Sequence, residues 1–182
     1  EGERIKSVVP AAEVKIPAGA TVVDLSRATV LPGLIDCHTH LSGRSDRYDP
    51  IYSFKDTPFH NAFAAVVNAR ATLEAGFTTV RDVGSDPFLA VDLRKSINEG
   101  FLVGPRVVAA GPGLSITSGH GDLNHYSPQT RVMMFPEQRD FSIADGPNQV
   151  RQTVRAQLKY GVDLIKVSAS GGVLSHGDHP GA

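Results

Sequence analysis

The stretch Val30-Leu-Pro-Gly-Leu-Ile-Asp-Cys-His-Thr-His40 decides the fold, because an apolar run that predicts a buried strand ends in two histidines. On a strand, residues i and i+2 point to the same face, so His38 and His40 present two imidazoles side by side. Two neutral imidazoles on one face are half of a ligand set for Zn²⁺ or a similar ion. The alternative is a pair of polar residues that simply meets solvent. Asp36 shares the face of His38 and is expected to serve as an inner-layer polar group or as an acceptor for an imidazole N–H.

Length and composition limit the classes of protein to consider. The 182 residues, 41% hydrophobic and 20% charged, suit one globular domain or a piece of a larger one. A net charge of -1 gives no electrostatic argument for nucleic acid or an anionic membrane surface. No apolar run approaches the ~18 residues of a transmembrane helix. The single cysteine, Cys37, excludes an internal disulfide, and the sequence assigns no cellular compartment.

From Val30 onward, strand and helix patterns alternate. We expect a parallel α/β sheet with right-handed crossovers, because such alternation produces it. An Asp86-Pro87 pair predicts the N-cap and first residue of the second helix, and glycines predict the helix ends. The expected strands are 30–36, 77–84, 106–110 and 163–169, and the expected helices are 59–75, 87–100 and 146–161.

The first 29 residues show a different pattern. Short β-like pieces at 4–9, 14–16 and 21–25 surround a turn at 17–19. We therefore expect two domains, a partial β-domain at 1–29 and an α/β domain at 30–182.

Lys166 lies in the fourth expected strand, where Ile165 and Val167 face one way and Lys166 the other. If Ile165 and Val167 pack on the helices, Lys166 faces the interior. A buried ammonium is costly unless it is paired or neutralised. Three solutions remain open: pairing with a carboxylate, extension of the side chain to the rim, or reaction of the neutral amine with CO₂ to a carbamate that bridges two metal ions.

The loop 111–146, roughly 35 residues long, far exceeds the usual strand-to-helix connection and is a candidate binding loop. It contains Gly119-His120-Gly121. His120 is a candidate to polarise a substrate carbonyl or to bind an oxyanion, and an ordinary flexible loop is the equal alternative.

Taken together, five segments resemble the amidohydrolase superfamily, in particular its prolidase-like branch of Xaa-Pro dipeptidases, dipeptide carboxypeptidases and ochratoxinase-like amidases. They are 31–41, 75–84, 104–113, 118–121 and 165–174. The resemblance implies a TIM-type (β/α)₈ barrel beside a small β-sandwich, with two divalent metal ions, zinc being the expected one. It implies that His38 and His40 bind one metal, that carbamylated Lys166 bridges both, and that His120 contacts the scissile carbonyl.

The same resemblance implies hydrolysis of an amide bond in a dipeptide or N-acyl amino acid by a metal-activated hydroxide. The family pattern also needs two more histidines and an aspartate from later strands, so we expect this chain to hold half a barrel and half a site. Such a piece is expected to be inactive alone and to associate with its missing half or a second copy. The alternatives are an imidazolonepropionase-like cyclic amidase with one metal, an organophosphate hydrolase, and a non-catalytic barrel half.

Overall fold

The computed structural model describes residues 4–43, 51–85, 88–124, 126–134, 136 and 138–172. The chain divides into two compact units, Glu1–Pro32 and Gly33–Ala182, which are described separately. None of the helices in the described ranges is both long and apolar enough to span a bilayer.

The first unit has no strand among its described residues 4–32 and holds one short 3₁₀ helix, η1 (Ala11–Glu13). The expected turn is present, since Ala20 N–H donates to the Pro17 carbonyl at 3.2 Å and Gly19 takes φ 82°. The expected β-pieces are exposed chain here, because a strand requires ladder partners for its backbone groups and none lies within the unit's described part. The small β-domain is not confirmed and stays a prediction.

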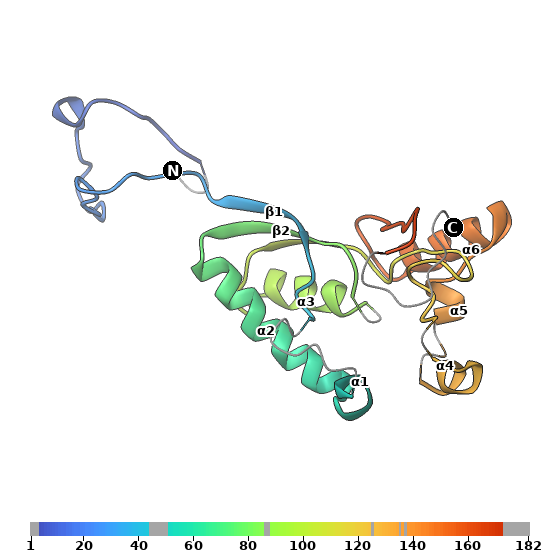
Figure 1. Cartoon of the computed structure of the whole chain (residues 1–182). Coiled ribbons are helices and arrows are strands. Elements are labelled where there is room, and N and C mark those ends of the chain that lie inside the picture. Colours follow the sequence, from blue (N-terminus) through green and yellow to red (C-terminus); the bar gives the residue numbers. More distant parts are fainter. Residues whose placement is uncertain are drawn as a thin grey trace. The chain divides into compact units, whose positions relative to one another are not determined.

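The second unit is built on a parallel sheet in the order β1 (Leu34–Thr39), β2 (Phe77–Asp82) and β3 (Arg106–Ala109). Helices α2 (Pro58–Glu74) and α3 (Leu89–Asn98) follow β1 and β2 and lie on the same side of the strands (Figure 1). The α/β class with a parallel sheet, predicted from the alternating pattern, is confirmed.

The expectation of a buried first strand is wrong in two respects. β1 begins at Leu34 rather than Val30, and its apolar residues Leu34 and Ile35 are 48% and 64% exposed. β1 lies at the edge of the described sheet and its register with β2 is irregular. The core lies instead between β2, β3 and the helices, where Val80, Val107 and Ala109 are buried.

Helix α2 is confirmed in position, and small residues form its buried face. Thr57 caps the helix by accepting the His60 N–H, and Gly76 takes φ 95° after the last turn. The large residues Phe63 and Val67 are exposed, whereas the small residues Ala65 and Ala69 are buried. A Cβ at Gly104 would lie 3.3 Å from that of Ala69, so small residues permit the close packing here.

Helices α3 and α6 (Gly146–Lys159) also lie where the sequence predicts them. The Asp86-Pro87 start of α3 falls outside the described residues, and Ser85 Oγ accepts the Ala90 N–H at 3.0 Å. In α6 the buried residues are Thr153 and Gln157, while the apolar Leu158 is 54% exposed.

The expected fourth strand at 163–169 is not a regular strand. The segment makes only isolated parallel bridges, Ala110 with Leu164 and Leu114 with Val167. Between them the opposing chain runs Gly111-Pro112-Gly113, and a proline has no N–H to continue a ladder.

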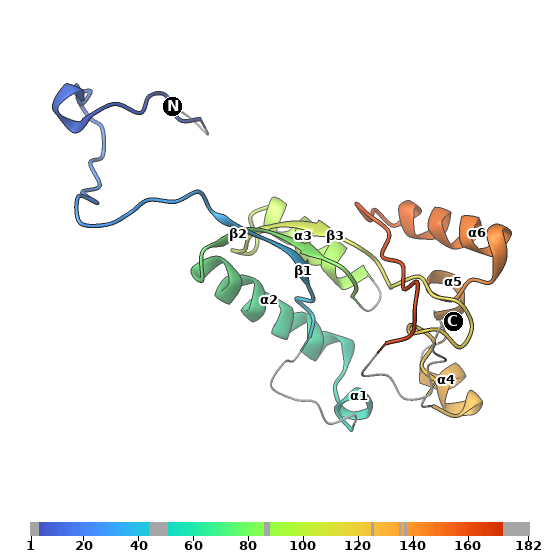
Figure 2. The ribbon, with the colours of Figure 1, turned by 45° about the horizontal axis from the view of Figure 1, so that its top comes forward.

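Three short helices complete the described elements, and α5 lies beside α6 in both views (Figures 1 and 2). They are α1 (Tyr52–Lys55), α4 (Pro128–Met134) and α5 (Gln138–Phe141).

Candidate metal centre

The two histidines of the opening motif lie together at the carboxyl end of β1. Their ring centres are 5.6 Å apart with the planes at 67°, and both side chains are exposed. Two imidazoles that share a tetrahedral zinc through bonds of about 2 Å have ring centres roughly 5 Å apart. The observed pair is therefore close to the arrangement that one metal ion requires.

His40 is oriented by a backbone carbonyl. Its Nδ1 lies 2.9 Å from the carbonyl oxygen of Gly84, which can only accept a hydrogen bond. Nδ1 therefore carries the hydrogen when the ring is neutral, and Nε2 holds the lone pair that a metal ion needs.

Asp36 forms a hydrogen bond with the backbone next to the histidine pair. Its Oδ1 accepts the backbone N–H of His38 at 2.9 Å rather than an imidazole N–H. Asp36 thus shapes the irregular end of β1 just before the histidine pair.

Asp82, at the end of β2, is a site residue that sequence reasoning missed. Its side chain is completely buried, and its two oxygens accept the N–H groups of Leu41 at 2.8 Å and Gly84 at 3.1 Å. Burial raises the pKa of the Asp82 carboxyl above its ordinary value, opposed by these two hydrogen bonds and by nearby His40. The spacing in Val80-Arg-Asp82, which puts Asp82 on the same face of the strand as the apolar Val80, is the signal that could have found it.

Asn68 on α2 contacts the turn that follows His40, where Asp82 accepts the Leu41 N–H. Its Nδ2 donates to the carbonyls of Leu41 at 2.8 Å and Gly43 at 2.9 Å. Leu41 itself is 2% exposed and packs in the core. The turn after His40 is consequently fixed by packing and by hydrogen bonds from two elements.

His120 lies exposed in a hydrogen-bonded turn rather than in a loose loop. Asp122 Oδ2 accepts the Ser118 N–H at 2.7 Å, and the Ser115 hydroxyl accepts the Gly121 N–H at 3.1 Å. Added Cβ atoms at Gly119 and Gly121 would come within 2.5 Å and 2.8 Å of Ser115, so close packing requires both glycines.

Lys166 lies past the carboxyl end of β3, on the same sheet end as the histidines but not beside them. Its segment pairs next to β3, so that two strands, β2 and β3, lie between it and β1. Three strand spacings amount to about 14 Å along a flat sheet, which curvature into a barrel would shorten. Among the described residues, no three His, Cys, Asp or Glu side chains lie close enough to hold a metal ion.

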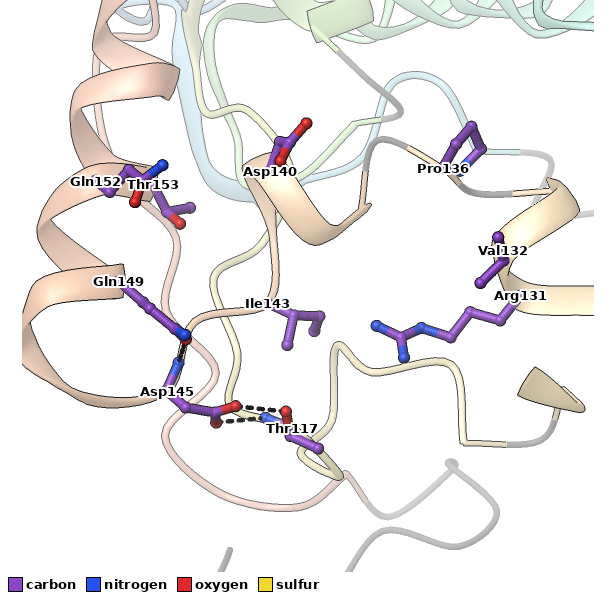
Figure 3. Close-up of a pocket in the computed structure, with 10 residues that line it drawn as sticks. All are labelled: Thr117, Arg131, Val132, Pro136, Asp140, Ile143, Asp145, Gln149, Gln152 and Thr153. Carbon is purple, nitrogen blue, oxygen red and sulfur yellow. Dashed lines mark hydrogen bonds between the residues drawn. The ribbon is translucent and has the colours of Figure 1, made fainter. Parts of the chain in front are cut away.

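A pocket of about 920 Å³ lies on another part of this unit, between the 117–122 turn, α4, α5 and α6 (Figure 3). None of its lining residues is one of the predicted site residues.

Asp145, on the wall of this pocket, accepts both the N–H and the hydroxyl of Thr117, at 2.9 Å and 2.5 Å, and its own N–H donates to Gln149. The two hydrogen bonds from Thr117, its hydroxyl first, lower the pKa of Asp145 below its ordinary value. The hydrogen bonds between Thr117 and Asp145 therefore link the 117–122 turn to the start of α6.

A parallel sheet with a histidine pair at the carboxyl end of β1 defines an α/β protein of the kind that builds sites at this end of its sheet. The chain belongs to the amidohydrolase family, whose profile matches residues 29–182. The resemblance predicted from the sequence is thereby confirmed.

Individual relatives agree with this assignment. Ochratoxinase from Aspergillus niger is 37% identical over 163 residues, covering 83% of this chain and 33% of the relative. A Xaa-Pro dipeptidase crystal structure with methionine bound in its active site is 38% identical with TM-score 0.71, covering 82% of this chain and 36% of that one. A prolidase complexed with N-methylphosphonate-L-proline is 30% identical with TM-score 0.65, covering 87% and 40%. The chain thus spans about a third of the length of the curated relatives it matches.

Proposed function

We propose that the complete protein is a metal-dependent hydrolase that cleaves the amide C–N bond of a dipeptide or an N-acyl amino acid. The observation that carries the proposal is the His38–His40 pair, with His40 Nδ1 bonded to the Gly84 carbonyl and Nε2 left as the metal-binding atom. Family membership and the ochratoxinase and prolidase relatives support amide hydrolysis.

In this proposal each residue has a distinct role. His38 and His40 would hold one of two divalent ions, with zinc the expected metal, and Lys166 as a carbamate would be the ligand that both ions share. The carbamate forms when the neutral amine adds to CO₂ and releases one proton. Bound metal ions would supply an activated water and polarise the scissile carbonyl. His120, at the surface of its hydrogen-bonded turn, orients the substrate carbonyl.

Metal analysis of the complete protein, combined with hydrolysis of Xaa-Pro dipeptides and N-acyl amino acids, tests the proposal. We expect about two divalent ions per chain, and loss of metal and activity in His40→Ala and Lys166→Ala. His60→Ala, an exposed histidine on α2, is the matched control and retains both.

The other outcomes separate the alternatives. One metal per chain with an active Lys166→Ala variant would favour a cyclic amidase, and cleavage of phosphotriesters alone would favour an organophosphate hydrolase. A metal-free complete protein would overturn the proposal and favour a non-catalytic role.

A further inference from the structure

One buried carboxylate connects both ends of the hydrogen bond that orients His40. On one side, Asp82 Oδ2 accepts the N–H of Leu41, the residue that follows His40. On the other side, Asp82 Oδ1 accepts the N–H of Gly84, whose carbonyl receives His40 Nδ1. The carboxylate therefore fixes the donor and the acceptor of the His40–Gly84 bond relative to one another.

A second side chain restrains the same turn from the helix layer. Asn68 donates to the carbonyls of Leu41 and Gly43, while Asp82 accepts from the Leu41 N–H. The peptide groups on both sides of Leu41 are thus held, one through its N–H and the other through its carbonyl oxygen. Because Leu41 is also buried in the core, the turn has little freedom to rotate the His40 ring away from Gly84.

We propose that Asp82 and Asn68 form a clamp, here the His40 clamp, that positions His40 with its hydrogen on Nδ1 and its Nε2 lone pair directed to the metal. Both are positioning residues, since neither is bonded to the ring itself. A carboxylate is required at position 82 because both of its oxygens face N–H donors. An asparagine there would turn an NH₂ group toward one of those donors and lose that bond. This inference rests on the proposed metal site.

The test uses Asp82→Asn in the complete protein with ¹⁵N-labelled histidine. Imidazole ¹⁵N shifts of the metal-free protein report which nitrogen of His40 carries the hydrogen. We expect the Nδ1–H form in the parent and a mixture with the Nε2–H form in the variant. Zinc affinity, measured by chelator competition, should fall about 10- to 100-fold, as for other residues that orient metal ligands.

Asp163→Asn is the matched control. Asp163 also accepts a backbone N–H, that of Ala109 at 2.8 Å, and pairs with Arg94, but its partners lie in β3 and α3. The control should leave the His40 shifts and the zinc affinity unchanged even where it lowers stability.

If Asp82→Asn fails to fold, Asn68→Ala tests the His40 clamp in its place. This variant removes the hydrogen bonds to the Leu41 and Gly43 carbonyls and leaves the Asp82 carboxylate in place. We expect the same changes in smaller measure. Unchanged His40 shifts and zinc affinity in a folded clamp variant would overturn the proposal. A parent protein that binds no zinc would overturn the proposed function instead, while the tautomer measurement would still test the clamp.

Discussion

Gly119 and Gly121 show how single residues shape the turn that carries His120. A Cβ at Gly121 would lie 2.8 Å from Ser115 Cβ, and one at Gly119 would lie 3.1 Å from the Ile116 carbonyl oxygen. Real Cβ atoms essentially never show a contact as short as 2.8 Å, and a contact of 3.1 Å is tighter than nine in ten, so a side chain at either position would displace its neighbours in the turn. The glycines are therefore explained by packing against Ser115 and Ile116, whether or not a ligand approaches.

Gly121→Ala should destabilise the protein by about 1–3 kcal/mol, the usual cost of overpacking a tight contact. Urea unfolding measures the loss, and amide exchange at 117–122 should show that the turn has opened.

A double-mutant cycle with Ser115→Gly provides the control for this prediction, because it removes the Cβ that the new methyl meets. The two changes should couple favourably by at least about 0.5 kcal/mol, as expected for groups in contact. Strict additivity of the two free energies would show that the clash is elsewhere.

At the scale of elements, the Thr117–Asp145 pair joins the long loop to the start of α6. Two hydrogen bonds from Thr117 stabilise the ionised carboxylate and keep the pKa of Asp145 below its ordinary value. A depressed carboxyl pKa means that the link is present at neutral pH and is lost as pH falls through the folded-state pKa. The loop is consequently tied to the helix at every pH above the acid range.

Thr117→Val should raise the pKa of Asp145 toward its ordinary value, since the hydroxyl donor is lost and the backbone N–H remains. Carboxyl ¹³C shifts followed against pH measure the change. The control is Thr130→Val, whose hydroxyl contacts Ser127 rather than Asp145. An equal titration of Asp145 in parent and Thr117→Val would contradict this account.

Gln157 performs a similar connecting role inside the structure. It is fully buried on α6, and its Nε2 donates to the carbonyls of Pro112 at 2.8 Å and Phe141 at 2.5 Å. It therefore joins α6 to the start of the long loop and to α5. A hydrophobic pattern search overlooks such a residue because its side chain is polar.

Gln157→Glu keeps the shape but sets an acceptor against two carbonyl oxygens, so we expect a loss of about 3 kcal/mol or more at neutral pH. Protonation would relieve the repulsion, which raises the pKa of the new carboxyl when folded. The loss should therefore be smallest in acid and grow as pH rises.

Gln152→Glu, on the exposed side of the same helix, should change stability by no more than about 0.5 kcal/mol. Equal denaturation midpoints for the two variants would contradict the role given to Gln157.

At the scale of the whole molecule, local patterns predicted most elements and half of the candidate site. The period of α2, the glycine after it and the His-x-His spacing all depend on residues a few positions apart, which the sequence displays directly. Apart from the local Asp82–Gly84 bond, the His40 clamp depends on contacts between residues 25 to 41 positions apart, and no local pattern encodes these. The exposed β1 and the irregular fourth strand were missed for the same reason, because strand burial depends on which neighbours pair.

The exposed edge strand β1 leads to a prediction about self-association. Leu34 and Ile35 on β1 are largely exposed, and in the described residues β1 pairs only with β2. An open apolar edge is a template for another strand, so the 182-residue chain produced alone should self-associate and bind a hydrophobic dye.

Light scattering after size exclusion measures this, with circular dichroism to check folding. A lysine on an edge strand opposes pairing, so Ile35→Lys should shift the chain toward its 19.4 kDa monomer. Val8→Lys makes the same change at a residue that is 86% exposed and lies outside the sheet, and it should leave association unaltered. A monomeric parent chain, or equal effects of the two substitutions, would show that the β1 edge is not the contact surface.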